Sequence, residues 1–290
     1  MRDKPLVSIV TPSYNQGRFI EDTILSVKNQ DYPNIEHIVV DGGSTDNTLD
    51  ILKKYEGTYN MRWISEPDEG QSDAVNKGFR MAKGEIIGWL NSDDVYFDIS
   101  AISSVVKFFD KYNDTDVIYG DAAVIDKDNL IMKVLCTKKF DYRYLQKTCY
   151  IVQPAVFFRR KIIDKHKLDT RLNYAMDYEF WLRIAKEHKF RHISQILAGD
   201  RNHEQRKIIA RRDEMIKESI LVSEEYGKGY HNMNLLYRIF YRFLARLRTI
   251  RALIKLQSLY FKDNFAFEAK LDNRLLSSFR QLFYSVERCI

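Results

Sequence analysis

Short hydrophobic runs alternate with amphipathic segments along the first hundred residues. Four runs rich in β-branched residues predict buried strands at residues 6–11, 35–40, 61–65 and 86–90. The first of these runs is expected to stop at Pro12. Apolar residues at helical spacing predict helices at residues 19–29, from a cap at Ser44 or Thr45 to about Tyr55, and at residues 72–82. This regular alternation with short loops predicts a parallel, doubly wound α/β sheet.

The pattern becomes less regular after residue 100. It predicts a helix at residues 102–112, a strand at 117–121, and then a hairpin made from residues 122–125 and 130–135. Further along, the predicted elements are a strand running into a short helix (153–160), a helix (174–183) and a strand (190–196). We therefore expect a mostly parallel sheet with a small antiparallel part.

Polar clusters follow each of the first four predicted strands, at residues 11–14, 41–44, 66–68 and 91–94. Because the carboxyl ends of parallel strands share one edge of the sheet, these clusters are predicted to line a ligand site. The last cluster contains two adjacent carboxylates, which repel each other unless a cation lies between them. An Asp-Asp turn that caps the next helix is the alternative. Gly-rich dinucleotide and P-loop motifs are absent from the sequence.

Composition narrows the class of protein. The chain has 290 residues, 45% of them hydrophobic, which is enough for one large α/β domain or for one domain plus an appendage. Three scattered cysteines predict neither a disulfide framework nor a zinc site, and they favour a cytoplasmic location. The N-terminal residues lead directly into a strand, so we expect no signal peptide. No uncharged apolar run is long enough to span a bilayer.

Positive charge is concentrated in the last third of the chain. Residues 205–290 carry 17 Lys/Arg and 9 Asp/Glu, a net charge of +8, whereas the whole chain is +6. After a helix at 208–226, a long helix is predicted at 235–261, with an apolar stripe flanked by arginines and no acid. Three roles stay open: association with an anionic membrane, packing on the catalytic part, or self-association into a homo-oligomer. We expect two regions, residues 1–205 and a basic helical extension, residues 206–290.

Four motifs in order carry a resemblance to a known family. They are Ser8-Ile9-Val10-Thr11-Pro12-Ser13-Tyr14-Asn15, Val39-Val40-Asp41-Gly42-Gly43-Ser44-Thr45-Asp46, Ser65-Glu66-Pro67-Asp68-Glu69-Gly70 and Asn91-Ser92-Asp93-Asp94. Together they resemble the family 2 glycosyltransferases, over roughly residues 5 to 205. The resemblance implies the GT-A fold and a nucleotide-diphospho-sugar donor.

The resemblance also implies donor-binding residues. Thr11, Pro12 and Tyr14 would cradle the base and ribose, with the tyrosine ring as a stacking surface. Asp41 would accept the imide N–H of uracil, if the base is uracil. Lys77, one helical turn from Asp73, would reach the nucleotide. For Lys77, a solvated helix residue is the alternative.

Asp93 and Asp94 correspond to the acidic metal motif of the fold, and the implied ion is Mn²⁺ or Mg²⁺, which would stabilise the leaving diphosphate. The family often has Asp where this chain has Asn91, so which carboxylate binds the ion stays open. Arg201 and His203 form an Arg-x-His that in the family contacts the diphosphate or metal. A surface histidine without a role is the alternative for His203.

Asp177 lies at the start of a helix predicted by Phe180 and Ile184, where the helix dipole favours a carboxylate. Alignment of Trp181-Leu182-Arg183 with the family pattern puts Asp177 at the position of the catalytic base, although the usually acidic residue before it is Met176. A helix N-cap is the alternative. Glu179 is a weaker candidate for the base.

The sequence thus predicts an inverting, metal-dependent glycosyltransferase. It would move sugar from a nucleotide-diphospho-sugar, with UDP expected, to a hydroxyl of a glycan or lipid-linked acceptor in cell-surface polysaccharide synthesis. We expect the protein in the cytoplasm, bound peripherally to the inner face of the cell membrane.

Three other classes of protein were weighed against this prediction. A nucleotidyltransferase would need a Gly-rich phosphate loop where this chain has residues 11–14. A nucleic-acid-binding protein would interleave exposed aromatics with its basic residues, so no nucleic acid is expected. A non-catalytic relative would lack the base or the acidic pair, and this chain has both.

Overall fold

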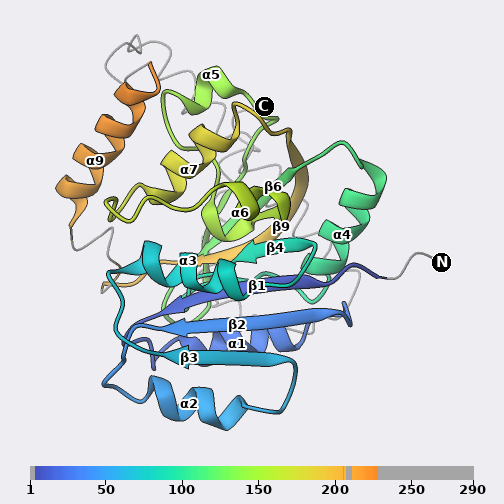
Figure 1. Ribbon diagram of the computed structural model, residues 1–290, viewed down its shortest axis with the longest axis vertical. Helices are drawn as coiled ribbons and strands as arrows, with labels where there is room; N and C mark the ends of the chain where they lie inside the picture. Colours follow the sequence, from blue (N-terminus) through green and yellow to red (C-terminus); the bar gives the residue numbers. More distant parts are fainter. Residues whose placement is uncertain (1–3, 205, 207–210, 228–290) are drawn as a thin grey trace, which may run out of the picture.

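The computed structural model describes residues 4–204, 206 and 211–227, and in it one sheet runs through the fold (Figure 1). Its strand order is β3-β2-β1-β4-β8-β6-β9-β5, with β7 paired to β6. The strands are β1 Val7–Ser13, β2 Ile35–Asp41, β3 Met61–Ser65, β4 Ile86–Trp89, β5 Val95–Tyr96, β6 Val117–Ile125, β7 Ile131–Leu135, β8 Val156–Arg159 and β9 Phe190–Arg201.

The first four strands pair in parallel, with β1 between β2 and β4 and with β3 outside β2. Strand β8 runs antiparallel to both β4 and β6, and β5 and β7 are also antiparallel to their neighbours. Strands β6 and β9 are parallel again, with two register shifts. The predicted α/β sheet, parallel at first with a smaller antiparallel part, is confirmed.

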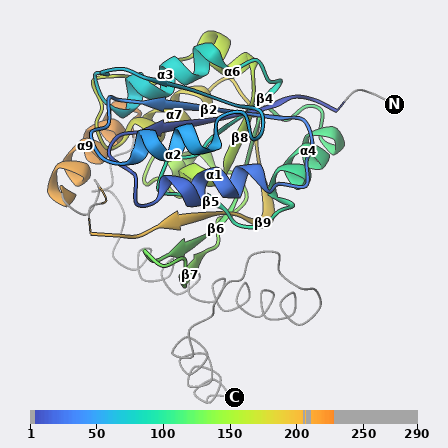
Figure 2. The same cartoon turned by 90° about the horizontal axis from the view of Figure 1, so that it is seen from below.

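Helices cover both faces of the sheet (Figure 2). They are α1 Ile20–Lys28, α2 Thr48–Tyr55, α3 Gln71–Met81, α4 Ala101–Lys111, α5 Tyr142–Leu145, α6 Lys161–Lys165, α7 Met176–Ile184 and α9 Arg212–Glu225, with a 3-10 turn η1 Gln153–Ala155. The two-residue period of a strand sorts its side chains between the faces. Val10 and Val40 pack with α3, whereas Val39 packs with α1 and α2.

Strand β1 does not stop at Pro12 as predicted but continues to Ser13. Pairing with β4 ends at Val10, so only β2 borders the strand beyond that point. Pro12 has no N–H group to donate, and no strand lies on the open side to accept a hydrogen bond there, so the sheet tolerates it.

The predicted cap of the second helix was also wrong. Helix α2 begins at Thr48, not after Ser44 or Thr45. The hydroxyl of Ser44 bonds Asp41 instead, and the Asp46 carboxylate accepts the Thr48 N–H at 3.0 Å.

Four further elements differ from prediction. The predicted strand at 117–121 and the first hairpin arm form one strand, β6, and β9 runs on to Arg201. Strand β5 and helix α5 were not predicted, because two and four residues are too few to display a period.

Of the predicted C-terminal region, the structure describes α9, which agrees with the helix predicted at 208–226. It packs against the fold near α7, where Ser223 Oγ donates to the Gln146 carbonyl at 2.7 Å. The predicted long helix at 235–261 lies outside the described residues. Among the described helices, none is long and apolar enough to cross a bilayer.

Candidate active site

A cavity of about 560 Å³ opens at the carboxyl ends of β1 and β4, between these strands, α7 and the end of β9. Six of the residues singled out from sequence line it: Pro12, Tyr14, Asp93, Asp94, Asp177 and His203. Five others do not line it: Thr11, Asp41, Asp73, Lys77 and Arg201. Asp68, from the polar cluster predicted at residues 66–68, also lines the cavity, together with three polar residues that the sequence did not point to: Gln153, Asp200 and Arg206.

Tyr14 lines the cavity with 59% of its surface exposed. The loop that carries it is held to the loop after β2. The Asn15 N–H donates to Ser44 Oγ at 2.7 Å, and the Thr45 N–H donates back to Asn15 Oδ1 at 2.8 Å. An exposed ring on a loop fixed in this way offers a preformed stacking surface.

Asp41 is fully buried at the end of β2, beneath this loop. Its carboxylate accepts the N–H groups of Gly43 (3.0 Å) and Ser44 (2.8 Å) and the hydroxyls of Ser44 (2.5 Å) and Ser65 (2.7 Å). A carboxylate has about four acceptor sites, so these four bonds use its capacity. In this structure Asp41 shapes the loop from below.

Thr11 is also buried, one layer under the cavity. Its hydroxyl lies 2.9 Å from His37 Nε2, and His37 Nδ1 lies 2.6 Å from the Tyr59 hydroxyl. Burial lowers the pKa of His37 to about 3, so this chain of hydrogen bonds is neutral. It supports the floor of the site.

Lys77 links helix α3 to the loop after β3. Its ammonium lies 2.9 Å from Glu66, 3.4 Å from Asp73 and 3.2 Å from the Pro67 carbonyl. These partners hold both Lys77 and Asp73 outside the cavity wall. The lysine is therefore more than a solvated helix residue, because it orders the loop that carries Asp68.

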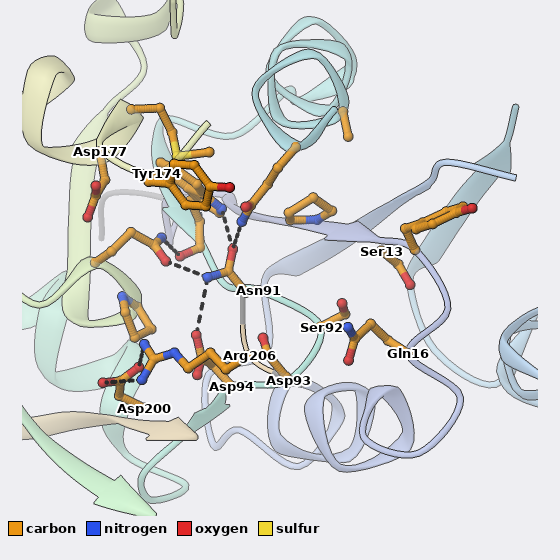
Figure 3. A pocket seen from close by; sticks show the side chains of 18 of the residues that line it. Ser13, Gln16, Asn91, Ser92, Asp93, Asp94, Tyr174, Asp177, Asp200 and Arg206 are labelled. Carbon is orange, nitrogen blue, oxygen red and sulfur yellow. Dashed lines mark hydrogen bonds and ion pairs between the residues drawn. The ribbon is translucent and has the colours of Figure 1, made fainter. Parts of the chain in front are cut away.

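Asn91 forms the centre of a hydrogen-bond network (Figure 3). Its Oδ1 accepts from the Trp89 indole (2.9 Å) and Gln71 (2.8 Å), while its Nδ2 donates to Gln153 (3.0 Å) and Asp94 (3.3 Å). The indole nitrogen only donates, which fixes the orientation of the amide. An Asp here would lose both donor bonds, so asparagine fits this network.

Asp94 is buried, with 2% of its surface exposed, and accepts the Arg201 N–H at 2.9 Å. Burial, and then the charges of Asp93 and Asp200, raise the pKa of Asp94 well above its usual value. Asp93 is more open, and its Oδ2 lies 3.0 Å from His203 Nε2. Asp93 therefore presents its carboxylate toward the cavity, and Asp94 supports it.

Arg201 and His203 have different positions. The Arg201 guanidinium is fully buried, bonding Asp22 at 3.0 Å and the Asp93 carbonyl at 2.6 Å, so it braces the acidic corner from behind. His203 packs on Phe19, with ring centroids 4.5 Å apart, and lines the cavity. Its Nδ1 is buried and has no hydrogen-bond partner within the described part of the chain.

Asp200 and Arg206 complete this end of the cavity (Figure 3). Arg206 Nη2 lies 2.5 Å from Asp200 Oδ1. Burial raises the pKa of Asp200 despite this pairing. Neither residue was predicted, because neither belongs to a motif that the sequence displays.

The acidic corner fits a hard divalent cation. Three carboxylates, Asp93, Asp94 and Asp200, share the cavity side of the corner with the His203 imidazole and the Arg206 guanidinium, while Arg201 lies behind them. Their mutual repulsion and the unpartnered His203 nitrogen are relieved if a cation binds between them. Carboxylate oxygen and imidazole nitrogen are ligands suited to Mn²⁺, and carboxylate oxygen to Mg²⁺.

Asp177 lies in the first turn of α7, across the cavity from this corner (Figure 3). It is not the helix cap, because the N-cap residue is Ala175, and no described side chain caps the helix. The Glu218 carboxylate of α9 accepts the N–H groups of Tyr174 (2.7 Å) and Ala175 (2.6 Å), which lead into the helix. Burial raises the pKa of Asp177 to about 6. Its described hydrogen bond comes from the Tyr178 N–H, at 2.8 Å.

Glu179, the weaker candidate for the base, is already engaged. It pairs with Arg183 at 2.8 Å and accepts the Tyr226 hydroxyl at 2.6 Å. It does not line the cavity. The geometry thus separates the two acids of this helix into one that faces the site and one that holds the helix in place.

Comparison with known proteins agrees with this architecture. The model of the family described as "Glycosyl transferase family 2" matches residues 8–167, more than half of the chain. An uncharacterized glycosyltransferase of Methanocaldococcus jannaschii is 29% identical over 205 residues, 67% of this chain and 70% of that protein. Chondroitin synthase of Pasteurella multocida is 30% identical over 194 residues, 66% of this chain but 20% of the relative.

Two solved structures share the fold. TarS of S. aureus in complex with UDP-GlcNAc aligns with a TM-score of 0.60 and 19% identity, over 76% of this chain and 66% of that one. The mannosyltransferase PcManGT of Pyrobaculum calidifontis, in complex with GDP-Man and Mn²⁺, aligns with a TM-score of 0.59 and 20% identity, over 79% and 66%. The predicted GT-A fold is confirmed. The chain spans about two thirds of these structures and a smaller part of several relatives.

Proposed function

Because the chain belongs to glycosyl transferase family 2, we propose that it transfers a sugar, with inversion, from a nucleotide-diphospho-sugar to an acceptor hydroxyl. One observation carries the proposal. The Asp177 carboxylate faces the acidic corner across one cavity, and no described cation pairs with it. This separation suits a direct displacement, in which the acidic corner holds the leaving group and Asp177, on the opposite wall, accepts a proton.

In this proposal Asp177 is the general base. Its Oδ atom accepts the proton of the acceptor hydroxyl as that oxygen bonds to the anomeric carbon. The raised pKa of about 6 makes it a stronger base than an ordinary carboxylate, while it remains ionised near neutral pH. Glu218 keeps the first turn of α7 in place, so the base keeps its direction.

The acidic corner holds the leaving diphosphate. Asp93 and His203 would bind Mn²⁺ or Mg²⁺ directly, since they face the cavity, and Asp94 would hold Asp93 in position from its buried site. The ion, when bound, supplies charge that neutralises the diphosphate. Arg206 adds a positive charge at the same end, once it exchanges Asp200 for a phosphate oxygen.

The nucleotide would lie between Pro12, Tyr14 and Asp68, with its base on the exposed tyrosine ring. Asp41, whose acceptor sites are used, would order this loop and contact uracil only by giving up one of its bonds. UDP as the nucleotide is supported by the UDP-GlcNAc complex of TarS, although PcManGT takes GDP-Man. Thr11, Asp73, Lys77 and Arg201 would support the site from outside it.

We further propose a glycan or lipid-linked acceptor and a role in polysaccharide synthesis, supported by the likeness to chondroitin synthase. A cytoplasmic location belongs to the same proposal and is supported by the scattered cysteines. Peripheral membrane binding, with self-association as its alternative, depends on the basic C-terminal region, of which residues 228–290 lie outside the described part of the chain.

The test is a screen of UDP- and GDP-sugars for Mn²⁺-dependent nucleotide release by the full chain. We expect one donor to be turned over, and the Asp93→Asn variant to lose at least roughly 100-fold in rate while keeping its fold. Asp31→Asn, an exposed carboxylate after α1, is the control. The metal assignment would be contradicted if turnover depended on neither Mn²⁺ nor Mg²⁺, or if the Asp93→Asn variant were as fast as the control.

A further inference from the structure

A second group of potential ligands lies away from the cavity. His166, Glu187 and His188 bring one ligand atom each to within 4.8 Å of the others. His166 directly follows α6, and the other two lie between α7 and β9. Strand β9 separates this group from the proposed active site, since His188 precedes its first residue and Asp200 lies near its last.

Each imidazole of the group has one nitrogen that is buried and unpaired. Nε2 of His166 and Nε2 of His188 have no hydrogen-bond partner anywhere in the described ranges. The His188 side chain is only 8% exposed. An unsatisfied buried polar atom costs about 1–3 kcal/mol, so two of them, in rings with centroids 5.6 Å apart, indicate a shared partner.

The surroundings of His188 fix which nitrogen is available. Its Nδ1 lies 3.2 Å from the carboxylate of Asp116, which Lys161 also contacts at 2.5 Å. The Nδ1–H group therefore donates to Asp116, which leaves a lone pair on Nε2. A carboxylate that orients an imidazole from behind is the usual outer partner of a metal-binding histidine.

We infer that His166, Glu187 and His188 bind a Zn²⁺ ion, which links the segment after α6 to the segment after α7. Two imidazoles and one carboxylate, with water as a fourth ligand, form a zinc donor set. Glu187 is exposed, so the ion and its water reach the site from solvent. Zinc–nitrogen bonds of about 2.0–2.1 Å place two ligand nitrogens about 3.3 Å apart, so the rings move slightly together on binding.

Arg183 accommodates this binding. Its Nη1 lies 3.5 Å from His166 Nδ1, at the limit of a hydrogen bond. When Nε2 binds zinc, the proton of the neutral ring resides on Nδ1, and this contact is given up. Arg183 keeps its bonds to Glu179 at 2.8 Å and to the Lys167 carbonyl at 2.7 Å, so its charge stays compensated.

The test is a ZnCl₂ titration of the metal-free full chain by calorimetry and thermal unfolding. Because the acidic corner also attracts Zn²⁺, the parent protein carries Asp93→Asn and His203→Gln. We expect this parent to bind about one equivalent of Zn²⁺ at the second group, with a rise in Tm. Adding Glu187→Gln or His166→Gln should weaken this binding by roughly tenfold or more.

Glu56→Gln, an exposed glutamate after α2, is the matched control and should bind as the parent does. Equal Tm values without metal show that Glu187→Gln leaves the fold intact. Co²⁺ gives a second readout, because its visible absorption depends on the ligands and should change in the histidine variant. Absence of Zn²⁺ uptake by the parent, or equal affinity in parent and ligand variants, would overturn the inference and leave the proposed transferase untouched.

Discussion

The carboxylate beneath the Tyr14 loop and the carboxylates of the cavity wall have opposite surroundings; in the proposed function these two parts are the nucleotide end and the reactive end of the site. Asp41, beneath the loop, is buried but accepts four hydrogen bonds from its own chain. Asp94, Asp177 and Asp200 line the cavity with fewer donors, and loss of hydration raises the pKa of each. The same residue type therefore holds the loop in place at the nucleotide end and has a raised pKa at the reactive end.

The difference shows how the site divides its work. Hydrogen bonds that the protein makes for itself complete the nucleotide end before any ligand binds. The acidic end remains electrostatically incomplete, since repelling carboxylates are relieved only by protons or a cation. In the proposed function, the loop above Asp41 would bind the base, and the carboxylates of the cavity wall would activate the sugar and the acceptor.

The largest effect is expected at the reactive end. Asp177→Asn removes the proton acceptor while it preserves size, so we expect kcat to fall by about 10³-fold. UDP affinity, measured by calorimetry, should change little, because the nucleotide end is intact. Asp50→Asn, an exposed acid in the first turn of α2, is the control. Turnover in Asp177→Asn equal to that of the control would remove the base assignment.

The second prediction concerns the structural anchor. Asp41→Asn replaces one acceptor oxygen with a donor that faces groups which also donate. We expect the free energy of unfolding to fall by about 2–4 kcal/mol, measured by urea denaturation. The Asp31→Asn variant should unfold as the wild type does. Unchanged stability of Asp41→Asn would mean that its four hydrogen bonds are replaceable, and the comparison between the two ends would fail.

The third prediction uses the raised pKa of Asp177, which is about 6. Asp200 raises this pKa further and Arg206 opposes it. A base must be ionised, so kcat/KM should fall about tenfold per pH unit below pH 6 and level off above it.

Stability should change in the opposite direction. The unfolded pKa of Asp is about 3.9, so the stability associated with protonated Asp177 is present at low pH and is lost as the pH rises through about 6. Denaturation of the wild type and of Asp177→Asn across pH 4–7 measures this. A stability difference between them that stays constant across this range would contradict the assigned pKa.

The smallest effect is expected for the residue that holds the base in place. Glu218→Gln weakens the bonds to the N–H groups at the start of α7, so we expect a loss of about 1 kcal/mol in stability. The value of kcat should fall a few-fold with unchanged UDP affinity. Glu224→Gln, an exposed residue of the same helix, is the control. Loss of stability with unchanged kcat would limit Glu218 to a structural role.

Much of the first half of the fold was predictable, because its signals are local. The strand β3 was predicted with its observed bounds, and β2 and β4 to within a residue. The rule that parallel strands end at one edge placed Asp93 and Asp94 at the site, from periodicity and turn residues alone. Asp177 came from the family resemblance around Trp181-Leu182-Arg183, and it lines the same cavity.

Other parts of the site depended on contacts between distant segments. The segment that leads into α7 is held by Glu218 of α9, and Asp200 reaches the cavity only because β9 pairs with β6. No local pattern marks Glu218, Asp200 or Arg206, since each acquires its role from a neighbour far along the chain. The zinc ligands His166 and His188 were missed for the same reason.

The sequence by itself determined the family, the α/β alternation and the identity of the acidic pair, because these depend on short motifs and on periods of two and 3.6 residues. Only the tertiary structure decided what each carboxylate does. Asp41 and Asp177 have the same chemistry, but the number of hydrogen-bond donors and the burial around each one differ. Those quantities are set by long-range packing, which makes one of them an anchor and leaves the other free to accept a proton.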